Sequence, residues 1–180
     1  MKVLVAGIGN IFFGDDGFGP EVARELANEL IAEPIPDVKV EDYGIRGLHL
    51  AYELISGYDR AILIDAVPRG GAPGTLYVIE PEVRDTGAPP DAHRMDLENV
   101  FSFVRMLGGE APPITLVGCE PSAADEEIGL TEPIRNAVRP AIALVRRLII
   151  GAAQPPDAPQ ADAHAAHNDD SKRSTACTRV

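Results

Sequence analysis

The sequence predicts an α/β protein, a three-layer α/β/α sandwich with a mostly parallel, twisted sheet of five strands. Short apolar runs typical of strands alternate along the chain with longer segments whose apolar residues recur at helical spacing. Residues 60–65 form an apolar run that ends in an acid, as expected of a strand buried on both faces. A glycine-rich turn directly follows the first predicted strand. Strands that alternate with helices in this way favour a parallel sheet covered on both sides.

The first elements are predicted by local pattern. Residues 2–6 are the apolar run before the glycine-rich turn, and we expect them to form the first strand. A helix is predicted over residues 20–31, because Pro20 suits a first helical turn, where its missing N–H costs no hydrogen bond. Residues 38–42 alternate between apolar and polar side chains and predict the second strand. Residues 48–55 predict a short helix before the third strand.

The middle of the chain adds a fourth strand at residues 74–79. Residues 81–90 have little apolar content and predict a long loop, a feature that is often functional in a compact domain. A helix is predicted over residues 97–107, with Asp96 as its N-cap and Gly108 at its end.

The last predicted elements are a fifth strand at residues 114–119 and a helix at residues 131–150, which Pro140 is expected to bend. From residue 151 onward the composition changes to Ala, Pro, Asp, Gln and His without periodicity. Such a segment cannot bury enough apolar surface to offset its ordering entropy. We therefore expect one domain over residues 1–150 and a disordered tail over residues 151–180.

Composition excludes several classes of function. The formal net charge is −12, and Lys and Arg form no cluster of the kind that binds nucleic acid. No run of about 18 apolar residues occurs, so no membrane span is predicted. Cys119 and Cys177 match neither a disulfide framework nor a zinc-binding spacing, and we expect Cys119, at a strand end, to be a buried thiol. We expect a cytoplasmic monomer with neither nucleic acid nor a membrane as a partner.

The glycine-rich turn over residues 7–19 carries two adjacent carboxylates, Asp15 and Asp16. Backbone N–H groups of such a turn commonly bind phosphate, but carboxylates repel phosphate and suit a metal ion or a proton-transfer role. A dinucleotide-binding fingerprint requires a third glycine where this chain has Phe12. Asp42 does end the second predicted strand, where a ribose-binding acid would lie, so a dinucleotide-binding enzyme stays an alternative.

Four candidate side chains follow predicted strands or lie in the long loop. Ligands of open α/β sheets bind beyond the carboxyl ends of the strands. Asp16, Asp42 and Asp65 come at or after the ends of the first three strands, and His93 precedes a predicted helix. Two carboxylates and a histidine would make a site for a divalent metal, with positions open for water or substrate.

Each candidate also has a structural explanation. Asp15 or Asp16 could cap the helix that follows the glycine-rich turn. Asp65 could fasten the loop after its strand, and His93 could be a solvated loop histidine. Spacing alone leaves both explanations open at every position.

The sequence resembles the hydrogenase maturation endopeptidases, a family that removes a C-terminal extension from the large-subunit precursor of nickel–iron hydrogenases. The resemblance covers residues 1 to about 151. It rests on the pattern Gly-x-Gly-Asn-x4-Asp-Asp-Gly-x-Gly at residues 7–19, on Ile64-Asp65-Ala66, on His93 and on Leu116-Val117-Gly118-x2-Pro121. The segment Ile128-Gly129-Leu130-Thr131 also resembles the family's approach to its final helix.

The resemblance implies an α/β/α sandwich and a metal-binding trio at Asp16, Asp65 and His93. The loop after the second strand departs from the family pattern Asp-Gly-Gly-Thr-x-Gly, because Ile45 stands at the position of the Thr, while Asp42 is kept. This departure leaves the hydrogenase partner open.

The implied reaction is cleavage of one bond in the [NiFe]-hydrogenase large-subunit precursor, which would itself present nickel to the trio, although other divalent metals could occupy the site. The metal could polarise the scissile carbonyl or activate water, or a carboxylate, with Asp42 as the candidate, could act as general base. A second alternative is a non-catalytic module that binds the precursor in a nickel-dependent manner. The sequence leaves these alternatives open.

Overall fold

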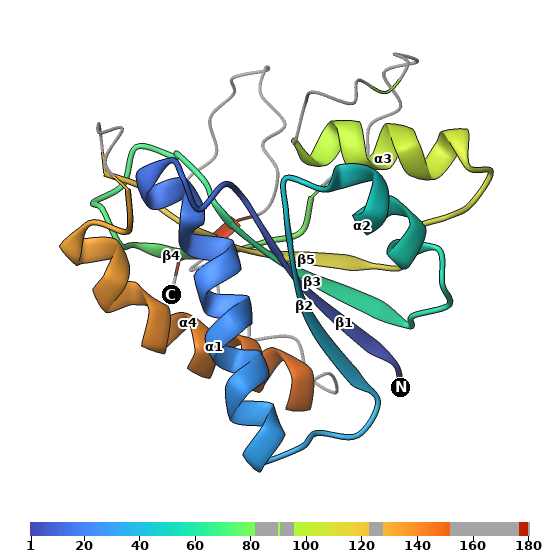
Figure 1. Ribbon diagram of the computed structural model, residues 1–180, viewed down its shortest axis with the longest axis horizontal. Coiled ribbons are helices and arrows are strands. Elements are labelled where there is room, and N and C mark those ends of the chain that lie inside the picture. Colours follow the sequence, from blue (N-terminus) through green and yellow to red (C-terminus); the bar gives the residue numbers. More distant parts are fainter. Residues whose placement is uncertain (82–89, 91–95, 123–127, 152–176, 180) are drawn as a thin grey trace, which may run out of the picture.

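The computed structural model describes residues 1–81, 90, 96–122, 128–151 and 177–179, which form a three-layer α/β/α sandwich (Figure 1). The strands are β1 (Val3–Ile8), β2 (Val38–Gly44), β3 (Arg60–Ala66), β4 (Leu76–Ile79), β5 (Ile114–Cys119) and β6 (Cys177–Arg179). The helices are the 3₁₀ turn η1 (Gly14–Gly17), α1 (Phe18–Ala32), α2 (Gly47–Leu54), α3 (Leu97–Met106) and α4 (Glu132–Ile150). The predicted fold class is therefore confirmed. Among the described helices, none has the length and apolar character needed to cross a membrane.

The sheet has the strand order β2-β1-β3-β5-β4-β6. Strands β2, β1, β3 and β5 are parallel, whereas β4 runs antiparallel to β5 and β6 antiparallel to β4. All five predicted strands are present, and β6 is a sixth. Because Cys177–Arg179 pair with β4, the expectation of a tail disordered throughout is wrong for these three residues. The other tail residues, 152–176 and 180, lie outside the described part of the chain.

Two hydrophobic layers enclose the sheet. Helices α1 and α4 cover one face, and α2 and α3 cover the other (Figure 1). All six residues of β1 are buried, with Val3 and Val5 packed on the α1/α4 side and Leu4 and Ala6 on the α2/α3 side. This alternation is what a strand covered on both faces requires, and it explains the continuous apolar run in the sequence.

Helix boundaries follow the predicted signals closely. Asp96 is the N-cap of α3, and its carboxylate accepts a hydrogen bond from the Asn99 N–H at 2.8 Å, as predicted. Helix α1 begins two residues earlier than expected, at Phe18, and has no side-chain cap. The adjacent acids Asp15 and Asp16 lie in η1 instead, so neither caps α1.

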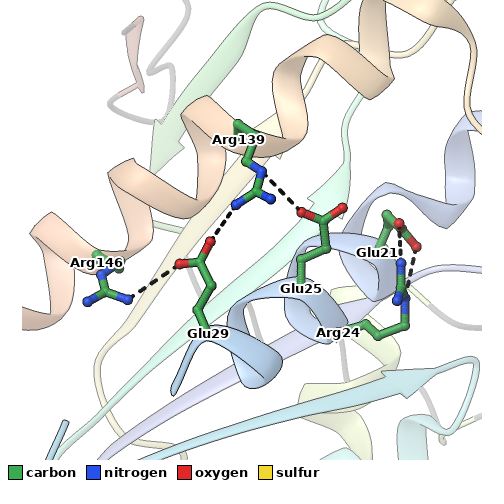
Figure 2. A network of polar contacts seen from close by, with 6 residues as sticks. All are labelled: Glu21, Arg24, Glu25, Glu29, Arg139 and Arg146. Atoms are coloured by element: carbon green, nitrogen blue, oxygen red, sulfur yellow. Dashed lines mark hydrogen bonds and ion pairs between the residues drawn. The ribbon is translucent and has the colours of Figure 1, made fainter. Parts of the chain in front are cut away.

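An ion-pair network joins the exposed sides of α1 and α4 (Figure 2). Arg139 contacts Glu25 at 3.5 Å and Glu29 at 2.6 Å, and Arg146 contacts Glu29 at 3.4 Å and Glu33 at 3.0 Å. Exposed pairs of this kind contribute only about 0–1 kcal/mol each. The apolar faces of the two helices therefore hold them on the sheet, and the ion pairs fix how they sit against each other.

Candidate active site

The strand order places a topological switch point between β1 and β3. After β1 the chain crosses to β2 on one side, and after β2 it returns to β3 on the other side of β1. The loops after β1 and β3 therefore diverge, and ligands of open α/β sheets bind in the crevice that such divergence leaves. Asp16 follows β1, and Asp65 is the second-last residue of β3. These are two of the predicted site residues.

Glycines bring the start of α1 onto the ends of these strands. A Cβ atom on Gly19 would lie 2.2 Å from the carbonyl oxygens of both Ile8 and Ile64, a distance that no side chain tolerates. Gly9 has φ +125, and a Cβ there would lie 1.9 Å from the Asp16 carbonyl oxygen. The glycine-rich turn therefore allows close backbone approach, which presents Asp16 at the rim of the sheet.

Asp16 is exposed, and one of its oxygens is fixed by the backbone. Its Oδ2 accepts a hydrogen bond from the Asn10 N–H at 2.7 Å, and its own N–H donates to the Phe13 carbonyl at 3.0 Å. Among the described residues, Oδ1 has no hydrogen-bond donor. The carboxylate is thus oriented by the turn and keeps one oxygen for an external ligand.

Asp65 is the half-buried neighbour of Asp16. Burial raises the pKa of Asp65 to about 7, and the charge of the nearby Asp16 makes a smaller contribution in the same direction. The Ala66 N–H donates a hydrogen bond to the Asp65 Oδ1 at 2.9 Å, which acts to lower this pKa. The electrostatic coupling shows that the two predicted carboxylates are brought together. Two adjacent carboxylates repel each other, and a divalent cation is the partner that relieves this repulsion.

Asp42 lies near this pair but belongs to another strand. It is opposite Gly7 of β1, and Gly7 is opposite Ile64 of β3. Two strand spacings, about 10 Å, therefore separate its backbone from β3. Its Oδ1 is buried and has no hydrogen-bond partner among the residues that the structure describes.

His93 lies outside the described residues, so the predicted trio of two acids and a histidine stays a prediction. Among the described residues, no group of three or more His, Cys, Asp and Glu side chains is gathered for a metal ion. The carboxylates of Asp16 and Asp65 are nevertheless donors that suit a divalent cation, and a nitrogen ligand would complete a mixed set.

Asp15 has a structural role that the sequence left open. It is 9% exposed, and its carboxylate accepts hydrogen bonds from the Ser122 N–H at 2.9 Å, from the Thr131 N–H at 2.7 Å and from the Thr131 hydroxyl at 3.0 Å. Asp15 therefore anchors η1 to the segments that follow β5 and precede α4. Of the two adjacent acids, Asp15 holds the turn in place and Asp16 faces the crevice.

Glu120 is a buried carboxylate that the sequence analysis did not single out. It accepts hydrogen bonds from the backbone N–H groups of Arg69 and Gly70 and from the Tyr77 hydroxyl at 2.7 Å. Burial alone would raise the pKa of Glu120, but these donors lower it to about 2. Glu120 thereby fixes the loop after β3. Cys119 is a buried free thiol, as expected, and burial raises its pKa to about 12.

Comparison with known families gives the context for this site. The family model of the hydrogenase maturation proteases, HycI, matches residues 20–148. The chain belongs to this family. The recognition from sequence is thereby confirmed, and so is the assignment as a peptidase, which leaves the dinucleotide-binding alternative without support.

Individual relatives agree. The Hydrogenase 2 maturation protease of Escherichia coli (strain K12) is 31% identical over 150 residues, which cover 79% of this chain and 87% of the relative. The Hydrogenase expression/formation protein HupD of Rhizobium leguminosarum bv. viciae is 32% identical over 152 residues, covering 82% and 74%.

Solved structures share the fold. The hydrogenase maturating endopeptidase HybD from E. coli aligns with a TM-score of 0.67 at 26% identity, covering 85% of this chain and 94% of that one. The hydrogenase 2 maturation peptidase from a Thaumarchaeota archaeon aligns with a TM-score of 0.61 at 32% identity, covering 83% and 98%. The α/β/α architecture is therefore the architecture of this protease family.

Proposed function

We propose that this protein is the endopeptidase that removes the C-terminal extension of a nickel-loaded [NiFe]-hydrogenase large-subunit precursor. Family membership supports the reaction class. The observation that carries the finer proposal is the coupled pair Asp16 and Asp65 at the switch point of the sheet. We infer that these two carboxylates, with His93, contact nickel that the precursor brings with it.

This arrangement would make cleavage conditional on metal insertion. Without a cation, Asp16 and Asp65 repel each other, and a precursor that lacks nickel offers them no partner. A precursor that carries nickel gains carboxylate contacts that hold its C-terminal segment at the sheet edge. Positioning of this kind lowers the barrier only for the loaded substrate.

Asp42 is our candidate for general base. Hydrolysis requires a group that takes a proton from the attacking water as its oxygen bonds to the carbonyl carbon, and the C–N bond then breaks as the leaving amine gains a proton. The Asp42 Oδ1 is buried without a hydrogen-bond partner among the described residues, so it is free to accept such a proton. Metal-assisted activation of the same water is the alternative chemistry.

The test uses purified precursor with and without nickel, and the mass of the product after incubation. Asp16→Asn, Asp65→Asn and His93→Ala should each fold and lose at least about 100-fold in cleavage of the loaded precursor. Asp42→Asn should lose cleavage and still bind the precursor. The exposed Glu110→Gln is the matched control and should cleave normally.

Two results would overturn the proposal. Full activity in the Asp16, Asp65 and His93 variants would remove the site. A stable nickel-dependent complex with no loss of precursor mass, for the unmodified chain, would show the non-catalytic binding module instead. The cytoplasmic location and the monomeric state stay predictions.

A further inference from the structure

A cavity of about 370 Å³ adjoins the turn that carries Asp16. Its lining includes Gly14 and Gly17, the two ends of η1, together with residues of α1 and of the first turns of α4. Ile11, Leu130 and Val138 give it an apolar lining. The site described above does not use this cavity, although both are built on the same turn.

Exposed apolar side chains adjoin the lining residues of the cavity along the chain. Three consecutive side chains before η1 are exposed: Ile11 (53%), Phe12 (69%) and Phe13 (59%). Ile128, which is 84% exposed, directly precedes the lining residues Gly129 and Leu130. Runs of exposed apolar residues usually mark a binding surface.

Each acidic side chain of the cavity lining lies near an arginine. Figure 2 shows that Glu21 pairs with Arg24, at 2.5 Å, and that Glu25 pairs with Arg139, at 3.5 Å. The same guanidinium of Arg139 also contacts Glu29, at 2.6 Å. Arg139 is thus shared between Glu25 and Glu29, and the Glu25 Oε2 is buried without a hydrogen-bond partner among the described residues.

Arg135 is the lining cation for which the described part of the chain provides no ion-pair partner. Its guanidinium donates to the Leu130 carbonyl at 2.7 Å, which holds it at the cavity wall. No carboxylate of the described residues lies within ion-pair distance of it. It also lies in the first turn of α4, where the helix dipole adds positive partial charge. Arg135 therefore offers an anionic ligand group a partner at the cavity wall.

We propose that the cavity binds a segment of the precursor close to the scissile bond, through an apolar side chain placed against Ile11, Leu130 and Val138 and a neighbouring carboxylate placed against Arg135. The proposal rests on the proposed function, because it gives the same substrate a second point of attachment. Its location beside η1 would bring the bound segment past Asp16.

Cleavage kinetics test the assignment of each group. Arg135→Gln should raise KM for the nickel-loaded precursor about tenfold and leave kcat unchanged, since one charge-assisted contact is lost. Arg147→Gln, an exposed arginine in the last turn of the same helix, is the control and should change neither constant. Ile11→Ser should raise KM in the same way, whereas the exposed Ile31→Ser should not.

Binding can be followed without cleavage. Two synthetic peptides, acetyl-Gly-Leu-Glu-Leu-Gly-amide and the same peptide with Lys in place of Glu, are titrated while the backbone amides of Gly14, Gly17 and Gly129 are followed by NMR. We expect the acidic peptide to shift these signals in the unmodified chain and in Arg147→Gln, and not in Arg135→Gln. Equal shifts with the Lys peptide, or none with either, would overturn the proposal.

The two proposals can fail separately. A precursor left intact by the unmodified chain refutes the proposed function. Normal cleavage with an unchanged KM in Arg135→Gln refutes the assignment of the cavity and leaves the proposed function standing.

Discussion

We expect substitutions of the adjacent acids Asp15 and Asp16 to affect different properties of the protein. Asp15 is buried and accepts three hydrogen bonds from Ser122 and Thr131. Asp16 is exposed and accepts one, from the Asn10 N–H. Substitution of Asp15 should therefore lower the stability of the fold. Substitution of Asp16 should leave the stability nearly unchanged and abolish cleavage.

The magnitudes follow from the donors left behind. Asp15→Ala leaves the N–H groups of Ser122 and Thr131 without their acceptor, and each unsatisfied buried donor costs about 1–3 kcal/mol. We expect the free energy of unfolding to fall by about 3–5 kcal/mol, and Tm by roughly 10 °C for a domain of this size. Asp16→Asn keeps a carbonyl oxygen for Asn10, so the same free energy should change by less than about 1 kcal/mol.

Urea unfolding followed by circular dichroism measures the stability of both variants, and the mass of the precursor after incubation measures their activity. Asp15→Asn provides a milder change, because one amide oxygen still accepts a hydrogen bond while the amide NH₂ faces a donor. A destabilisation of Asp16→Asn as large as that of Asp15→Ala would refute the division of roles. So would normal stability of Asp15→Ala.

Two further changes test the framework around the site. Gly19→Ala places a Cβ 2.2 Å from two carbonyl oxygens and should lower the free energy of unfolding by about 3 kcal/mol, measured by urea unfolding. Gly57→Ala, where φ is +83 but space is open, should cost only about 1 kcal/mol; equal losses would refute the close approach. Glu120→Gln should destabilise the protein at pH 7. Because the folded pKa of Glu120 is about 2, below the ordinary 4.5, its contribution is complete above pH 4.5 and fades as the pH falls toward 2. The difference in Tm between Glu120→Gln and the unmodified chain should therefore become smaller as the pH falls from 4.5 to 2. The control Glu110→Gln should have the Tm of the unmodified chain at every pH. A Tm difference for Glu120→Gln that does not change with pH would contradict the hydrogen-bonded, ionised Glu120.

Local pattern was sufficient for most of the fold. The apolar run of β3 and the helical spacing of α1 are determined by what each segment buries, so periodicity predicts them. The direction of β4 and the pairing of β6 were not predicted, since both depend on which distant strand offers a free edge. The residues of β6 carry no apolar periodicity that would distinguish them from the rest of the tail.

At the candidate site, too, some features follow from local sequence pattern and others depend on distant parts of the chain. The placement of Asp16 and Asp65 at strand ends could be predicted because the carboxyl ends of parallel strands share one edge of the sheet, a rule that needs only the strand assignment; their role in the reaction stays a prediction. The role of Asp15 depends on Ser122, 107 residues further along the chain, and that of Glu120 on Arg69, 51 residues before it. The proposed role of Arg135 could not be predicted from the sequence either, since the sequence does not show which charged side chains form ion pairs.

The turn η1 couples the candidate active site to the cavity. Gly14 and Gly17 line the cavity, and the two residues between them are the anchored Asp15 and the exposed Asp16. Since Asp15 ties this turn to Thr131, immediately before α4, the position of Arg135 in the first turn of α4 and the position of Asp16 depend on the same hydrogen bonds. A precursor segment bound at Arg135, as proposed above, would therefore contact a helix that is tied to the turn carrying Asp16. This linkage gives the buried, hydrogen-bonded Asp15 a structural role directly beside Asp16, the exposed carboxylate that we propose as a site residue.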